Sequence, residues 1–246
     1  MFYSLFKSSA KLFVRNFINA FFCIIFPPVM IILFGSIYGN EPDSIYGGYG
    51  MVDVSIAAYV ALIISVTAFM GIPMELSNFR EKKILKKYMV TPVKQELFLC
   101  SEMLVNAIAT IIGIIVLFII GKFVYSVKFQ GNIFLFIAVF LLSLFSMFTI
   151  GLLLSNIGKN IKNTNTLCYS VFFPMLFLSG ATIPIELFPE SVKMVSKIIP
   201  LTYVVDMLKA SWLGKDIETF YIDIVITGLV LVIGVVLNIK LFKWTV

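Results

Sequence analysis

Residues 131–155 read GNIFLFIAVFLLSLFSMFTIGLLLS, a long run of mostly apolar side chains that contains no charged residue. An α-helix rises about 1.5 Å per residue, so roughly 20 apolar residues cross the ~30 Å hydrocarbon core of a bilayer. The segment is long enough and apolar enough for this, and it therefore predicts a transmembrane helix.

The rest of the chain has the same character. Of the 246 residues, 60% are apolar and 13% are charged, whereas soluble domains average about 45–50% and 25%. The apolar runs and their short loops leave no contiguous piece for a soluble catalytic domain. We therefore expect a single all-α, polytopic transmembrane domain over residues 1–246, with six transmembrane helices near 17–38, 54–76, 97–121, 131–155, 164–181 and 219–239.

Two segments outside these spans also carry apolar residues. Residues 1–15 place Phe2, Phe6 and Phe13 on one helical face and basic residues on the other, which predicts a helix lying in the membrane interface. A frayed, basic N-terminus is the alternative. Residues 182–216 mix prolines with apolar stretches too short to span, as re-entrant or interfacial segments do.

The spans contain few residues that disturb an apolar helix. Pro27 and Pro28 fall inside the first span and predict a kink there. An ion-coupled transporter would be expected to bury a carboxylate centrally. The candidates instead lie near predicted span ends, where side chains reach interfacial water: Glu75, Glu102, Asp206 and Asp223. This favours a driving force that comes from outside the chain.

Charge predicts the orientation, and missing residue types exclude whole classes of function. Most of the 19 Lys and Arg residues fall in segments on the same side as both termini, which predicts cytoplasmic termini in the plasma membrane. The net charge of +6 is explained by this bias and indicates no nucleic-acid partner. The chain has no histidine and no GxxxxGK[ST] motif, so we expect no catalytic residues, no metal site and no ATP site of its own.

The most charged segment, residues 78–94, has more order than a simple basic loop needs. Between Arg80 and Val90 it predicts a short amphipathic helix with a compact apolar face, and Thr91-Pro92 ends it. A positively charged loop that touches anionic lipid is the alternative. It explains the lysines but not the apolar face, so we favour a docking helix for a cytoplasmic partner.

Two stretches carry a family resemblance. Residues 80–93, REKKILKKYMVTPV, resemble the segment after the second span of type-2 ABC exporter permeases, although Lys83 and Ile84 stand where the family often has Gly-Thr. SGATIP (179–184), LFP (187–189) and IPLTYVVD (199–206) resemble the C-terminal signature of that family. The signature positions are Ser179, Gly180, Pro184, Pro189, Pro200, Thr202 and Tyr203.

The resemblance implies a permease subunit, not an enzyme, that pairs with a second copy as a homodimer or heterodimer. A separate cytoplasmic ATPase subunit would hold the ATP and Mg and would dock on a coupling helix within residues 78–94. Residues 1–15 would be a connecting helix, and residues 182–216 an external helical hairpin dipping into the outer leaflet. The expected coupling residues are Arg80, Glu81, Lys82, Lys83, Ile84, Leu85, Tyr88, Met89 and Pro92.

The resemblance also implies a substrate path at the dimer axis, lined by the second and fifth spans. The residues expected there are Tyr59, Thr67, Phe69, Met70, Phe172, Phe173, Met175 and Phe177. An uncharged lining rich in Phe and Met suits export of a hydrophobic or amphipathic substrate such as a drug, an antibiotic peptide or a lipid-like molecule. The alternative is a non-transporting membrane sensor or assembly protein that docks a partner through the same loop.

Overall fold

The computed structural model describes residues 2–84, 95–158 and 160–241, which form a bundle of helices with one short strand pair. The first half contains α1 (Phe2–Arg15), α2 (Phe17–Ala20), a π-helical turn (Phe21–Ile25), α3 (Phe26–Tyr38), β1 (Pro42–Asp43), a 3-10 turn (Ser44–Tyr46), β2 (Tyr49–Gly50), α4 (Met51–Val66), a second π-helical turn (Thr67–Gly71), α5 (Ile72–Glu81) and α7 (Gln95–Tyr125). The second half contains α8 (Ile133–Ile157), α9 (Ile161–Leu178), a 3-10 turn (Ile185–Leu187), α10 (Glu190–Ser196), α11 (Pro200–Trp212), a 3-10 turn (Ile217–Thr219) and α12 (Tyr221–Leu241).

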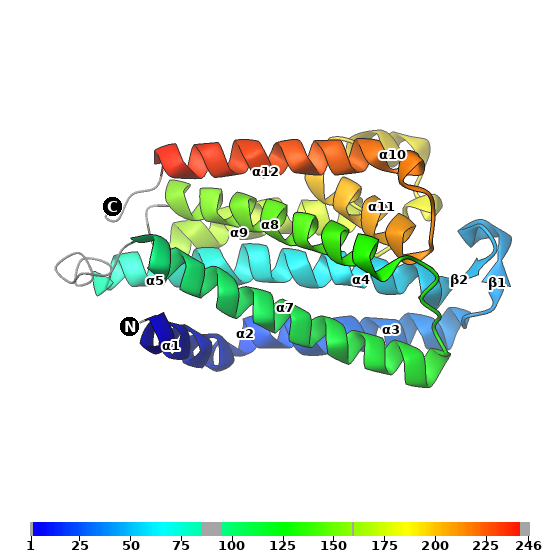
Figure 1. Cartoon of the computed structure of the whole chain (residues 1–246), viewed down its shortest axis with the longest axis horizontal. Coiled ribbons are helices and arrows are strands. Elements are labelled where there is room, and N and C mark those ends of the chain that lie inside the picture. Colours follow the sequence, from blue (N-terminus) through cyan, green and yellow to red (C-terminus); the bar gives the residue numbers. More distant parts are fainter. Residues whose placement is uncertain (1, 85–94, 159, 242–246) are drawn as a thin grey trace.

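The long helices lie side by side along the longest axis of the molecule (Figure 1). The start of α1, the end of α12 and the ends of α5 and α7 that flank residues 85–94 all lie at one end of the bundle, which we call the terminal end. The antiparallel pair β1–β2, which aligns Pro42 with Gly50, lies at the opposite end. The start of α1 and the end of α12 therefore lie at the same end of the bundle.

Helix length and hydropathy make the chain a multi-pass membrane protein. Among the described residues, five helical stretches are long and apolar enough to cross a bilayer: Phe17–Tyr38, Met51–Glu81, Leu97–Tyr125, Ile133–Ile157 and Tyr221–Leu241. The predicted span at 164–181 corresponds to α9, which is not among the five. Lys162, Asn163 and Asn165 make the first turns of α9 polar, yet α9 packs against α5 and α8 within the bundle. A sixth span therefore stays a prediction.

Both π-helical turns stand directly before prolines. We expected Pro27 and Pro28 to disturb the interior of a helix, but they lie in the first turn of α3, immediately after the turn Phe21–Ile25. Pro73 lies in the first turn of α5, after the turn Thr67–Gly71. Proline has no backbone N–H to donate, and a wider turn accommodates the interrupted hydrogen bonding. The irregularity therefore falls one turn earlier than the sequence suggested.

The second span forms the centre of the protomer. Nearly every side chain of α4 is buried, and α4 packs against α3, α7, α8 and α11. Helix α12 is peripheral by contrast: it packs mainly on α8 and exposes apolar side chains over most of its length. An apolar outer surface of this kind suits contact with lipid.

The segment between α9 and α12 folds into two short helices, α10 and α11. Ser196 Oγ donates a 2.5 Å hydrogen bond to Leu178 O, and Thr202 Oγ1 donates a 2.7 Å bond to Ser196 O. The first bond ties α10 to the end of α9, and the second spans the turn between α10 and α11. Helix α11 then packs against α4, α8 and α12. Insertion of this pair into the outer leaflet stays a prediction.

Candidate functional site

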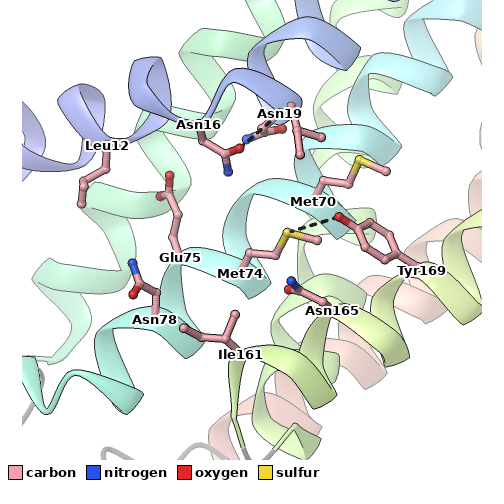
Figure 2. Close-up of a pocket in the computed structure, with 11 residues that line it drawn as sticks. Leu12, Asn16, Asn19, Met70, Met74, Glu75, Asn78, Ile161, Asn165 and Tyr169 are labelled. Carbon is pink, nitrogen blue, oxygen red and sulfur yellow. Dashed lines mark hydrogen bonds between the residues drawn. The ribbon is translucent and has the colours of Figure 1, made fainter.

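A cavity of about 290 Å³ opens near the terminal end of the bundle, where three helical segments approach one another (Figure 2). Its walls come from the α1–α2 junction, from the second π-helical turn with α5, and from the first half of α9. The lining residues are Leu12, Asn16, Ile18, Asn19, Met70, Met74, Glu75, Asn78, Ile161, Asn165 and Tyr169. The cavity thus combines apolar walls with four amide side chains and one carboxylate.

The first wall is formed where the chain turns from α1 into the first span. Asn16 caps α2, because its side-chain oxygen accepts a 3.3 Å hydrogen bond from Asn19 N. A cap of this type satisfies one of the free N–H groups of a helix start and lets the preceding chain change direction. Asn19 follows one turn later with only 1% of its surface exposed, and neither of its side-chain polar atoms has a hydrogen-bond partner among the described residues.

The second wall follows one face of the second span. Met70, Met74 and Asn78 recur every four residues and therefore lie on one side of the helix, with Glu75 beside them. Gly71 lets α7 approach this wall, since a Cβ at that position would lie 2.1 Å from Asn106 Oδ1 and 3.1 Å from Asn19 Nδ2. The absence of a side chain at Gly71 therefore leaves room for the buried amide groups of Asn106 and Asn19.

Glu75 is buried rather than interfacial. Its exposed fraction is 6% and that of Glu102 on α7 is 2%, which corrects the expectation that both reach interfacial water. The carboxyl group of Glu75 lies near that of Glu102, which accepts a hydrogen bond from Ser9 Oγ of α1. Apart from the Glu102 carboxyl group, no described residue offers a hydrogen bond to either oxygen of Glu75. Figure 2 shows the Glu75 side chain extending from α5 towards α1.

The third wall comes from α9. Ile161, Asn165 and Tyr169 recur every four residues along its first half and face the cavity together. Tyr169 Oη lies 4.0 Å from Met74 Sδ, which joins this wall to that of α5. Asn165 Oδ1 is a buried acceptor without a partner among the described residues.

The beginning of the predicted coupling segment contributes to the packing of the bundle. Arg80 is 8% exposed and donates hydrogen bonds to Ser155 O and, at 2.5 Å, to Asn156 Oδ1 at the end of α8. Glu81 accepts a 2.9 Å hydrogen bond from Ile161 N at the start of α9. We expected both side chains on a partner-docking surface. Arg80 is instead buried against the end of α8, whereas Glu81 is exposed and links the end of α5 to the start of α9.

The other coupling residues divide into two groups. Lys82 and Lys83 are exposed, and Ile84 is partly buried against the core. The remaining expected coupling residues lie outside the described part of the chain: Leu85, Tyr88, Met89 and Pro92.

Most of the residues expected along the substrate path lie elsewhere than in the cavity. Within the protomer, the aromatic rings of Phe69 and Phe172 pack with centroids 5.9 Å apart, and Thr67 Oγ1 lies 2.9 Å from Thr110 Oγ1. Of the expected residues, Met70 is the one that lines the cavity. The others are either buried between helices, as are Tyr59, Thr67, Phe69, Phe172 and Met175, or exposed on α9, as are Phe173 and Phe177.

The signature residues form the turns around α10 and α11. Gly180 has φ +82°, which favours glycine, directly after α9. Tyr203 Oη donates a hydrogen bond to Lys197 O, and Ser179 Oγ accepts a 3.3 Å bond from Ala181 N. The remaining positions stand at or next to helix starts, or bond the inter-helix turn: Pro184, Pro189, Pro200 and Thr202. The signature thus has a structural role in this protomer.

Sequence reasoning missed the polar part of the cavity. Polar or ionisable side chains inside a membrane span are costly and commonly functional, and that signal was present at Asn19 and Glu75. Asn19, Glu75 and Asn165 line one cavity because α2, α5 and α9 pack together, and no local sequence pattern encodes this packing.

The amino-acid sequence matches one known protein family over most of its length. Residues 1–213 match the profile of the family described as ABC-2 type transporter. The chain is 26% identical over 132 residues to the inner membrane transport permease YhhJ of Escherichia coli (strain K12), which covers 53% of this chain and 35% of that protein. It is also 26% identical over 125 residues to the probable multidrug ABC transporter permease YbhS of the same organism, covering 50% and 33%. The matched part is thus about a third of each relative, and both are named as permeases rather than enzymes.

Proposed function

Because the chain belongs to the ABC-2 type transporter family, we propose that it is the membrane-spanning permease subunit of an ATP-driven exporter. A separate cytoplasmic ATPase subunit, holding ATP and Mg, supplies the work. In this proposal α9 is the sixth span, the terminal end of the bundle faces the cytoplasm, and the chain lies in the plasma membrane. Its substrate is hydrophobic or amphipathic, and the name of the multidrug permease relative supports a drug-like molecule.

The observation that carries the proposal is the cavity next to the predicted coupling segment. It opens between three spans at the end of the bundle where residues 82–94 connect α5 to α7. A space with apolar walls and a few convergent polar groups is the usual form of a small-molecule site. Its position at the predicted cytoplasmic side suits capture of substrate before outward transport.

The connection between cavity and coupling segment supports ATP-driven movement. Helix α5 carries Met74 and Glu75 in the cavity wall and ends at Glu81, directly before the exposed Lys82 and Lys83. Force applied by an ATPase to residues 82–94 would therefore reach the cavity within two helical turns. The docking contacts in this proposal are Lys82, Lys83, Ile84, Leu85, Tyr88, Met89 and Pro92, with Arg80 and Glu81 fixing the base of the segment.

A second copy of the chain completes the proposed transporter. Helix α9 exposes Phe173 and Phe177 beside a cavity that is open on the protomer surface. A partner copy, identical or related, packed against α9 would cover these rings and close the substrate path at the shared axis. The alternative, a non-transporting sensor or assembly protein, would need the docking segment but no substrate cavity.

The test is reconstitution of the chain with its ATPase in liposomes. The exporter proposal predicts substrate-stimulated ATP hydrolysis and nucleotide-dependent movement of an amphipathic fluorescent substrate. Changing Glu81→Gln together with Leu85→Ala should leave membrane insertion intact and lower partner-dependent hydrolysis several-fold, whereas the matched external change Glu190→Gln should not. Transport at full rate without any nucleotide-hydrolysing subunit would refute the proposal.

A further inference from the structure

The buried polar atoms of the cavity are mostly hydrogen-bond acceptors. Asn19 Oδ1 and Asn165 Oδ1 have no partner among the described residues, and the two oxygens of Glu75 have none there apart from the Glu102 carboxyl group. Asn19 Nδ2 is the unpartnered donor among these three side chains. An unsatisfied buried polar group destabilises the fold, and a charged one does so more strongly. A ligand that brings several N–H donors would relieve this cost.

The cavity also favours positive charge. Its lining contains the carboxylate of Glu75 and, among the described residues, no lysine or arginine. The neighbouring Glu102 adds a second carboxyl group on the same side of the cavity. A buried negative charge is stable only when paired and hydrogen-bonded.

The remaining walls require an apolar body on the ligand. Leu12 and Ile18 cover one side, and Met70 and Met74 cover another. Methionine side chains adapt to ligands of varied shape, and Tyr169 adds to the lining an aromatic ring, a group that attracts cations. A bare metal ion fits such walls poorly. Among the described residues, no three or more His, Cys, Asp or Glu side chains cluster closely enough to hold a metal ion.

We propose that the cavity binds the protonated amine of an amphipathic organic cation, with Glu75 as the counter-charge and Asn19 and Asn165 as acceptors of the ammonium N–H groups. The inference rests on the proposed function, because it names the substrate class of the exporter's cavity. It adds charge selectivity that the Phe- and Met-rich path expected from the sequence did not contain.

The test is equilibrium binding to the purified full-length chain in phosphatidylcholine nanodiscs, with empty nanodiscs subtracted. Dansylcadaverine is the probe, and its N-acetyl and N,N,N-trimethyl derivatives are matched ligands that lose, respectively, the charge and the N–H donors. The amine should bind at least ~10-fold more tightly than the N-acetyl compound, a difference of about 1.4 kcal/mol or more. The trimethyl compound should fall between them.

Two variants separate the cavity from general effects. Glu75→Gln should bring the amine to within about twofold of the N-acetyl compound while leaving N-acetyl binding unchanged, which also shows that the cavity is intact. Glu41→Gln, an exposed carboxylate next to β1 at the other end of the bundle, should keep the wild-type preference. If Glu75→Gln does not fold, the three ligands on the wild-type chain still decide.

Equal affinity of the amine and the N-acetyl compound for the wild-type chain would overturn the inference, as would an unchanged preference in folded Glu75→Gln. The assay contains no nucleotide and no ATPase, so its result is independent of transport. An amine-selective cavity in a complex that transports nothing would refute the exporter and keep the site. A working exporter without amine preference would refute the site alone.

Discussion

Replacing Arg80 distinguishes two roles for its side chain: docking of a partner, as expected from the sequence, and the contact with α8 seen in the structure. If Arg80 docks a partner, replacing it should alter partner binding and leave the isolated chain stable. If its role is the contact with α8, replacing it should destabilise the chain without any partner present. We expect the second outcome for Arg80→Met, because the guanidinium is 8% exposed and bonds Ser155 O and Asn156 Oδ1.

The magnitude follows from those two bonds. Ser155 lies in the last turn of α8, where carbonyl groups have no partner within the helix and a positive charge is favourable. A hydrogen bond to a charged group contributes about 1.5–3 kcal/mol. Methionine recovers part of this through apolar packing, so we expect a net loss of about 2–4 kcal/mol in the free energy of unfolding.

The assay is reversible unfolding of the purified chain in mixed micelles, followed by helical circular dichroism. Lys82→Met is the matched control, since Lys82 is exposed two residues further on and should change stability by less than about 0.5 kcal/mol. Combining Arg80→Met with Asn156→Ala should cost less than the sum of the two, with a coupling of about 0.5–3 kcal/mol. Equal unfolding midpoints for Arg80→Met and Lys82→Met would refute the contact as a stabilising link.

Three further predictions address packing, the cavity and orientation. Gly151→Ala should destabilise the chain by about 1–3 kcal/mol in the same unfolding assay, because its Cβ would lie 1.9 Å from the backbone oxygen of Ala68. The control is Gly228→Ala on α12, where an added Cβ meets nothing within 4 Å, and it should be neutral or slightly stabilising. Gly71→Ala should weaken dansylcadaverine binding several-fold, because the added methyl group collides with Asn106 and Asn19 at the cavity wall. Cysteine labelling of intact cells with a membrane-impermeant reagent should modify Glu190→Cys and not Lys86→Cys; the reverse pattern would contradict cytoplasmic termini.

The sequence predicted the long helices well because membrane spanning is a local property. A window of some 20 apolar residues decides it, and the first predicted span, 17–38, coincides with the stretch Phe17–Tyr38. The polar first turns of α9 lower its mean hydropathy, so α9 does not meet the length and hydropathy requirement for a span, although it packs beside α5 and α8. Hydropathy therefore locates uniformly apolar helices, including the buried stretch Met51–Glu81, better than helices that carry polar residues into a bundle.

The candidate site was harder to predict because it depends on tertiary packing. Arg80 and Lys82 stand in the same basic run, and local charge gives no reason to bury one and expose the other. The difference arises because Arg80 faces the end of α8. In the same way, Asn19 and Asn165 line one cavity only because of the helix packing. The polar residues in the spans were visible in the sequence, but their convergence was not.

The position of α5 explains how one helix can serve both the coupling segment and the cavity. Its last turn is fixed to α8 through Arg80 and to α9 through Glu81, while Glu75 faces the cavity. At its other end, the π-helical turn Thr67–Gly71 joins α5 to α4 through the least regular part of the span. A load applied beyond Lys82 would therefore shift α5 together with the neighbouring ends of α8 and α9 before it moved α4, whose side chains are packed on every side. Under the exporter proposal, the shape of the cavity is thus the property that an ATPase can control from this end of the bundle.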